Sequence, residues 1–129
     1  ETKKAFSKIA KQREQLAYEI DGVVGYSRKY DLALIKIGDN SGTPLSFGSS
    51  SVDIGQKIFA IGNPLGLEGT ISDGIVSGLR DFEGFSLLQV SAPISPGSSG
   101  GPVVNENGEI IQVKHVSYGY LTISKHTLY

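Results

Sequence analysis

Short hydrophobic segments separated by glycine and proline dominate the chain after Tyr18. The segments are rich in Val, Ile, Leu, Phe and Tyr, and turn-forming residues recur every few positions between them. This pattern is typical of β-strands bounded by turns, so the sequence predicts an all-β fold. The predicted strands cover residues 18–25, 32–37, 57–62, 74–79, 86–90, 102–105, 109–114 and 120–124.

The dipeptide Asn107-Gly108 lies between two of these apolar segments, Val103-Val104 and Ile110-Ile111. Asn and Gly tolerate the positive φ angles of a type I′ turn, which suits the twist of two antiparallel strands. The sequence therefore predicts a β-hairpin with a type I′ turn here.

The first fifteen residues have a different pattern. Lysine and arginine outnumber acidic residues, and apolar residues from Phe6 to Ile20 recur at helical spacing. This spacing predicts a short amphipathic helix; a solvated basic arm or an irregular strand is the alternative. Residues 38–51, rich in Gly, Ser, Asn, Asp and Thr, are predicted to link two packed units.

Composition narrows the class of protein. The 129 residues suit one domain or part of a larger one, and 39% hydrophobic with 19% charged residues exclude a disordered tail. A net charge of −1 argues against nucleic acid as the main partner. No apolar run approaches the roughly 18 residues that a membrane helix needs. The chain begins at Glu1 and lacks Met, so we expect a processed product or a fragment of something longer.

Reactive groups are few. The absence of cysteine excludes a disulfide framework and a thiol nucleophile, but leaves the compartment open. Asp73 and Asp81 have no histidine at metal-ligand spacing, so we expect neither a metal nor another cofactor.

The most unusual segment runs from Ser95 to Pro102, where proline and three glycines frame serine residues. Glycine lets the backbone turn so tightly that the N–H groups of Gly97 and Ser99 can converge on one point. Two such donors beside a hydroxyl form an oxyanion hole, worth about 3 kcal/mol per donor in acyl transfer. The alternative is a flexible Ser/Gly loop.

The same residues also fit the G-x-S-x-G nucleophile elbow of esterases. That elbow must lead into a helix, whereas Pro102 is followed by the predicted hairpin. An esterase of the α/β-hydrolase type is therefore disfavoured.

A second candidate is Asp31, at the start of the apolar run 32–35. An aspartate at the end of a buried strand can orient a histidine and stabilise its imidazolium, although a single Asp is more often a turn residue. The order Asp then Ser fits a His, Asp, Ser triad.

Three segments together, residues 30–37, 61–67 and 94–105, resemble the trypsin-like serine proteases of the HtrA/Deg type. The similarity extends through residues 69–77 and 107–111 and covers about residues 18–113. The resemblance implies two Greek-key β-barrels with the active site between them. Residues 1–45 would be a remnant of the N-terminal barrel with a linker, and residues 46–129 the closed C-terminal barrel that carries the nucleophile.

The resemblance also implies roles for individual residues in the hydrolysis of peptide bonds in proteins. Ser99 would be the nucleophile and Asp31 the triad acid, with the amides of Gly97 and Ser99 as the oxyanion hole. Ile94 would line the primary specificity pocket. The strand around Lys114, His115 and Val116 would pair with the substrate backbone.

Two departures from the family pattern limit these expectations. No histidine precedes Asp31, and the two histidines, His115 and His126, follow Ser99 at positions that the family does not use. Gln112 stands where a glycine is usual, which would narrow the substrate cleft.

A catalytically inactive module that binds extended peptides is therefore the alternative to a serine endopeptidase. Most of the first barrel is also missing from the match, so we expect another chain, such as a homo-oligomer partner, a swapped segment or residues outside these 129 to complete it. The compartment is unknown from the residues; the resemblance favours a location outside the cytoplasm or secretion.

Overall fold

A computed structural model describes residues 6–11, 14–38, 42–49, 51–62, 69–82, 84–94, 97–113, 116–117 and 120–123. All of the regular elements in these ranges are β-strands, so the predicted all-β class is confirmed. The chain divides into two compact units, Glu1–Pro44 and Leu45–Tyr129.

The first unit is a three-stranded antiparallel sheet in the order β1-β2-β3. Its strands are β1 (Phe6–Lys11), β2 (Glu14–Ser27) and β3 (Leu32–Ile37). The helix expected in the first fifteen residues is wrong, because β1 pairs with β2 over the whole stretch from Phe6↔Glu19 to Lys11↔Glu14. Such a ladder satisfies the backbone groups between strands and overrides a weak helical spacing.

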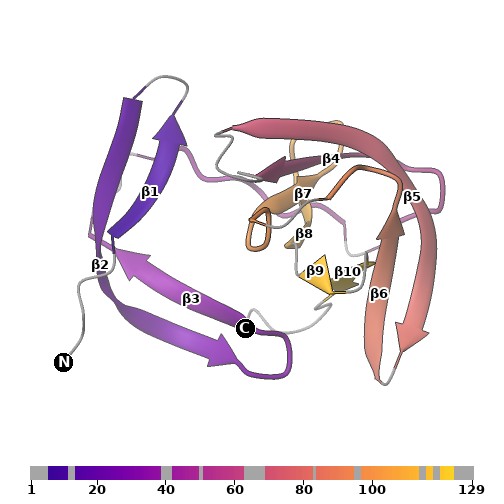
Figure 1. The fold of residues 1–129 in the computed structure, drawn as a ribbon, viewed down its shortest axis with the longest axis horizontal. Helices are drawn as coiled ribbons and strands as arrows, with labels where there is room; N and C mark the ends of the chain where they lie inside the picture. The colour runs from indigo at the N-terminus through magenta and orange to yellow at the C-terminus, as the bar shows by residue number, and fades with distance from the viewer. Residues whose placement is uncertain are drawn as a thin grey trace. The chain divides into compact units, whose positions relative to one another are not determined.

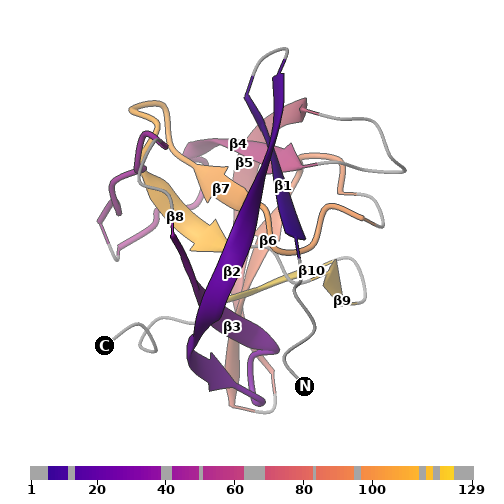
Figure 2. The same cartoon turned by 90° about the vertical axis from the view of Figure 1, so that its left-hand side faces the viewer.

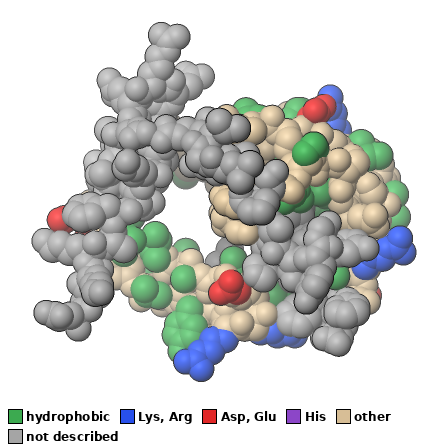
Figure 3. All heavy atoms as spheres, viewed as in Figure 1, with side chains coloured by type: hydrophobic (Ala, Val, Ile, Leu, Met, Phe, Trp, Pro, Cys, Tyr) green, Lys and Arg blue, Asp and Glu red, His purple; other side chains and the backbone are tan. Residues whose placement is uncertain are grey.

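Large apolar side chains remain exposed on the β2–β3 hairpin. In Figure 3 green side chains gather at the lower left, over this hairpin. They belong to a sheet of three strands, and such a small sheet has little area in which to bury them. Among the side chains that the structure describes in this unit, the large exposed apolar residues are Val23, Val24, Tyr26, Leu34 and Ile35.

The second unit is a seven-stranded antiparallel sheet in the order β8-β7-β4-β5-β6-β10-β9 (Figures 1 and 2). Its strands are β4 (Lys57–Gly62), β5 (Thr70–Phe82), β6 (Phe85–Val90), β7 (Pro102–Val104), β8 (Ile110–Val113), β9 (Val116–Ser117) and β10 (Tyr120–Ile123).

The long strand β5 gives this sheet its curl. Its first half pairs with β4 and its second half with β6, and Figure 1 shows it arching from one to the other. A register shift between Val76 and Gly78 marks the change of partner, as a β-bulge commonly does where a sheet bends. The result is a half-barrel. Among the described strands no ladder joins the two ends, β8 and β9, so the expected closed barrel is not confirmed.

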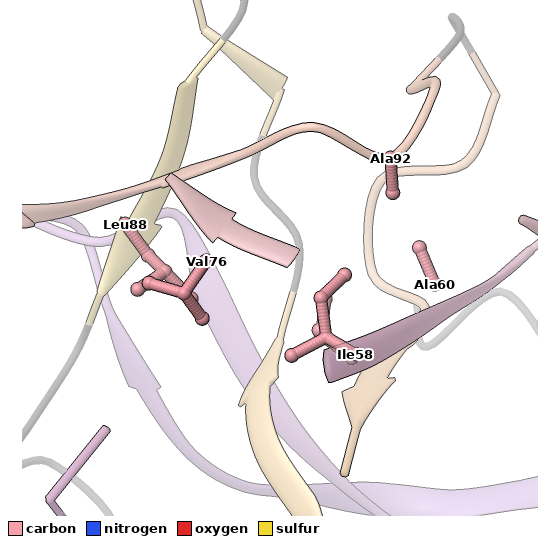
Figure 4. Packing of buried hydrophobic residues seen from close by; sticks show 6 residues of the cluster. Ile58, Ala60, Val76, Leu88 and Ala92 are labelled. Carbon is pink, nitrogen blue, oxygen red and sulfur yellow. The ribbon is translucent and has the colours of Figure 1, made fainter. Parts of the chain in front are cut away.

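The core of the second unit lies on the concave side of this curl. Alternate residues of β4 and β5 point inward, and Ile58 and Val76 have no exposed surface. Leu88 of β6 and Val103 of β7 are also fully buried. Figure 4 shows the cluster that these side chains form with Ala60 and Ala92. Ala92 and Val103 bracket the loop between β6 and β7, so the core holds both of its ends.

The β7–β8 hairpin is confirmed, but its turn differs from the predicted type I′. The Gly108 amide donates to the Asn105 carbonyl at 3.0 Å, and Gly108 has φ of 76°. Asn107 is not among the described residues with positive φ, which excludes type I′. A type I turn followed by a left-handed glycine fits instead. The Asn105 side chain stabilises it by accepting bonds from the amides of Asn107 and Glu109, each at 3.0 Å.

Candidate active site

Ser99 lies at the tip of a tight turn in the loop between β6 and β7. The Gly101 amide donates to the Ser98 carbonyl at 3.3 Å, so Ser99 and Gly100 are the two central residues of the turn. Gly100 has φ of 85°, whereas Ser99 is not among the residues with positive φ. This combination matches a type II turn, which requires a positive φ at its third position and therefore favours glycine there. The turn thus leaves Ser99 exposed.

The two residues before Ser99 differ in exposure. Gly97 has φ of 92°, a conformation that side chains rarely adopt, and it is exposed. Ser98 is 5% exposed and is one of two buried polar residues in the described part of the chain. The segment therefore directs one serine inward and the next outward. The other buried polar residue is Gln112, whose side-chain amide donates to the Val113 carbonyl at 3.3 Å.

The start of the loop is fixed to β5. The Ser91 amide donates to the Ile75 carbonyl at 3.0 Å, and the Ser91 hydroxyl accepts from the Ile75 amide at 2.9 Å. The Ser72 hydroxyl donates to the Pro93 carbonyl at 2.9 Å. Ser91 and Pro93 thus continue the contact with β5 beyond the last paired residues of β6.

The end of the loop is fixed by β7, which begins at Pro102. Val103 pairs with Ala60 of β4 on one side and with Gln112 of β8 on the other. A loop held by sheet pairing at both ends can keep the Ser99 turn in one conformation, as a preorganised site requires.

Asp31 lies in the first unit, in the turn that joins β2 to β3. It is exposed, and its φ of 51° makes it the one described non-glycine residue with a positive φ. Asp tolerates this left-handed region better than most residues, but the conformation is still strained. Strain of this kind clusters at functional sites, which supports a role for Asp31 beyond the turn itself.

The strain at Asp31 can be measured with two variants that both lack the carboxylate. We expect Asp31→Gly to be more stable than Asp31→Ala by about 1 kcal/mol, because only glycine adopts the left-handed conformation without strain. Urea unfolding of the two variants gives this difference directly. The same pair at Asp53, which is exposed and has no positive φ, is the control. At Asp53 we expect the alanine variant to be more stable than the glycine variant. The same difference in stability at both positions would contradict strain at Asp31.

The structure brings some of the predicted site residues together and leaves others apart. Ser98 and Ser99 share one turn that Gly97 directly precedes, and Ile94 lies in the same loop, partly buried against the core. Val116 begins β9 in the same unit. Asp31 belongs to the other unit. Lys114, His115 and His126 lie outside the described residues.

Sequence reasoning missed the residues that anchor the loop, namely Ser72, Gly74 and Ser91. A signal was present, because Ser72 and Gly74 occupy inward-facing positions of β5 where an apolar residue is usual. An added Cβ at Gly74 would lie 2.4 Å from the Ala92 nitrogen, so glycine is needed for the loop to pass.

The described ranges contain no group of three His, Cys, Asp or Glu side chains that could hold a metal ion. They also contain no helix with the length and apolar character that a bilayer crossing requires.

An exposed serine in a tight turn on a curled antiparallel sheet is the arrangement expected of a trypsin-like peptidase. Residues 2–112 match the trypsin-like peptidase domain, and the chain belongs to that family. Within the family the resemblance to HtrA/Deg proteins, inferred from the motifs, is confirmed.

Individual relatives agree with this assignment. The chain is 41% identical over 113 residues to a Chlamydia pneumoniae protein named "Probable periplasmic serine endoprotease DegP-like", with 78% of this chain and 23% of the relative covered. The crystal structure of Deg5 matches with a TM-score of 0.71 and 34% identity, over 85% of this chain and 57% of that one.

The HtrA-type protease AlgW, solved with a decapeptide, matches with a TM-score of 0.75 and 28% identity over 85% of this chain and 38% of that one. The chain thus spans less than a quarter of the length of that Chlamydia relative and only part of each solved structure.

Proposed function

We propose that this chain is part of a serine endopeptidase domain of the trypsin-like HtrA type, which hydrolyses peptide bonds in proteins. The observation that carries the proposal is the Ser98–Gly101 turn, which exposes Ser99 between two glycines of positive φ. Ser99 would attack the peptide carbonyl. The amides of Gly97 and Ser99 would stabilise the oxyanion as negative charge develops on it.

Asp31 would act as the triad acid by orienting a histidine, as its strained position supports. The histidine itself would come from outside these 129 residues, because none precedes Asp31. Residues 1–45 would then belong to the first barrel with a linker, and residues 46–129 to a second barrel that closes. Another chain, such as a homo-oligomer partner, a swapped segment or residues outside these 129 would complete the first barrel.

Substrate contacts follow from the same assignment. Ile94, partly buried in the Ser99 loop, would line the primary specificity pocket and favour small aliphatic side chains. Lys114, His115 and Val116 would pair with the backbone of an extended substrate by strand addition. The decapeptide in the AlgW structure supports a peptide ligand.

The sequence itself favours a second candidate function. Both histidines follow Ser99, so this chain alone lacks a histidine at the position that a His, Asp, Ser triad needs. A catalytically inactive module of the same fold, which binds extended peptides, would retain the sheet and lose only the reaction.

Covalent labelling by a fluorophosphonate distinguishes the two functions. The reagent is applied to this chain and to a version extended upstream by a histidine-bearing segment, with mass spectrometry to locate the modified residue. We expect modification at Ser99 in the extended chain and its loss in Ser99→Ala. Ser77→Ala, which removes an exposed serine from β5, is the matched control and should label normally. No labelling of either chain would favour the peptide-binding module.

A further inference from the structure

Strand β5 holds the start of the Ser99 loop by contacts at successive positions. Ile75 exchanges two hydrogen bonds with Ser91, at 3.0 and 2.9 Å. Gly74 leaves the space that Ala92 needs, since a Cβ there would lie 2.8 Å from the Ala92 Cα. The Ser72 hydroxyl donates to the Pro93 carbonyl at 2.9 Å. The loop therefore runs antiparallel to β5 for three more residues after β6 ends.

Ser72 is a polar residue on the inward face of β5. Residues 70, 72, 74, 76 and 78 are buried or half-buried, whereas 71, 73, 75 and 77 are exposed. The half-buried Ser72 hydroxyl donates to the Pro93 carbonyl of the neighbouring loop. Contact with the loop thus accounts for a serine at this position of β5.

The hydrogen bond from Ser72 is the bond by which Pro93 is held to β5. Proline has no backbone N–H, so a bond like the one that the Ser91 amide donates to β5 cannot form at this residue. Its carbonyl is its one backbone hydrogen-bonding group, and that group accepts from Ser72. The bond acts next to Ile94 and six residues before Ser99.

We propose that Ser72 is a positioning residue for the Ser99 turn, because its hydroxyl holds the loop to β5 at Pro93. This role rests on the proposed function only in that Ser99 is the nucleophile being positioned. Ser72 itself takes no part in bond making.

The test uses the 129-residue chain with three substitutions. Ser72→Ala removes the hydroxyl, Ser72→Thr keeps it, and Ser77→Ala makes the same change on the exposed face of β5. Residue-resolved NMR hydrogen exchange reports on the Gly101 amide, whose bond to Ser98 closes the turn. The amides of β4 report on global opening of the same unit.

We expect Ser72→Ala to speed exchange of the Gly101 amide about tenfold relative to the β4 amides, the effect of losing one hydrogen bond. Ser72→Thr should restore the original rate, and Ser77→Ala should leave it unchanged. An unchanged Gly101 rate, an equal change in β4, or no rescue by threonine would each overturn the proposal.

The labelling experiment tests the proposed function independently of these exchange rates. Absence of fluorophosphonate labelling in the histidine-completed chain would reject Ser99 as a nucleophile. The exchange rates would still decide whether Ser72 holds the turn.

Discussion

Peptide hydrolysis by the 129-residue chain is expected to be about a millionfold slower than by a complete protease of the same class. The reason is that a serine hydroxyl is a weak nucleophile until a base removes its proton. No histidine precedes Asp31 in the sequence, so the base of the His, Asp, Ser order is missing. An oxyanion hole formed by Gly97 and Ser99 would leave only a small residual rate over water.

Turnover of a fluorogenic peptide, measured beside a DegP-like protease, gives the ratio of the two rates. The variants His115→Ala and His126→Ala serve as controls, because these are the two histidines of the chain. We expect neither to change the residual rate; His115 would contact substrate through its backbone, which alanine retains. Turnover within a thousandfold of the complete protease, lost in His115→Ala or His126→Ala, would show that one of these histidines acts as the base.

The variant Gly74→Ala is expected to lower the free energy of unfolding by about 3 kcal/mol, the upper part of the usual range for overpacking. The added Cβ would lie 2.4 Å from the Ala92 nitrogen and 2.7 Å from the Ser91 Oγ. Two of the three nearest atoms are backbone atoms of Ala92, so no rotation of a side chain can relieve the clash. Ala92 is 5% exposed and belongs to the core, which limits how far the loop can shift.

Urea unfolding of Gly74→Ala and of Gly25→Ala tests this expectation. Gly25 also lies in a strand, has no positive φ, and has nothing within 4 Å of an added Cβ. Alanine there should be neutral or stabilising by up to about 1 kcal/mol, because it restricts the unfolded chain. A loss of stability at Gly25 as large as that at Gly74 would show that contact with Ala92 is not the cause.

Much of the strand pattern could be predicted from the sequence, because alternation and turn residues are local signals. The strands at 32–37 and 57–62 match β3 and β4 at both ends. The position of the β7–β8 hairpin was equally clear from Asn107-Gly108. Its turn type was not, because the Asn105 side chain selects a type I turn by accepting two backbone amides.

Features that depend on pairing between distant residues could not be predicted. The segment at Phe6 to Lys11 has helical spacing, and only its ladder with β2 makes it a strand. The Ser99 turn could be found from its glycines, since their positive φ is a local requirement. Ser72 and Gly74 stand out on the inward face of β5, but the loop residues that they contact could not be predicted, because Ser72 and Pro93 are 21 residues apart in the sequence.

Strand β5 both pairs with β4 and contacts the Ser99 loop, and these two roles constrain how its length can change during evolution. A deletion of one residue between Thr70 and Val76 would reverse the faces on one side of the deletion, because side chains alternate with a period of two. Ser72 and Gly74 would then either face outward or lose their partners in the loop. Removing two residues would preserve the faces but shift the register with β4. Insertions and deletions are therefore better tolerated in the turn at Gly84, which joins β5 to β6, than within the first half of β5.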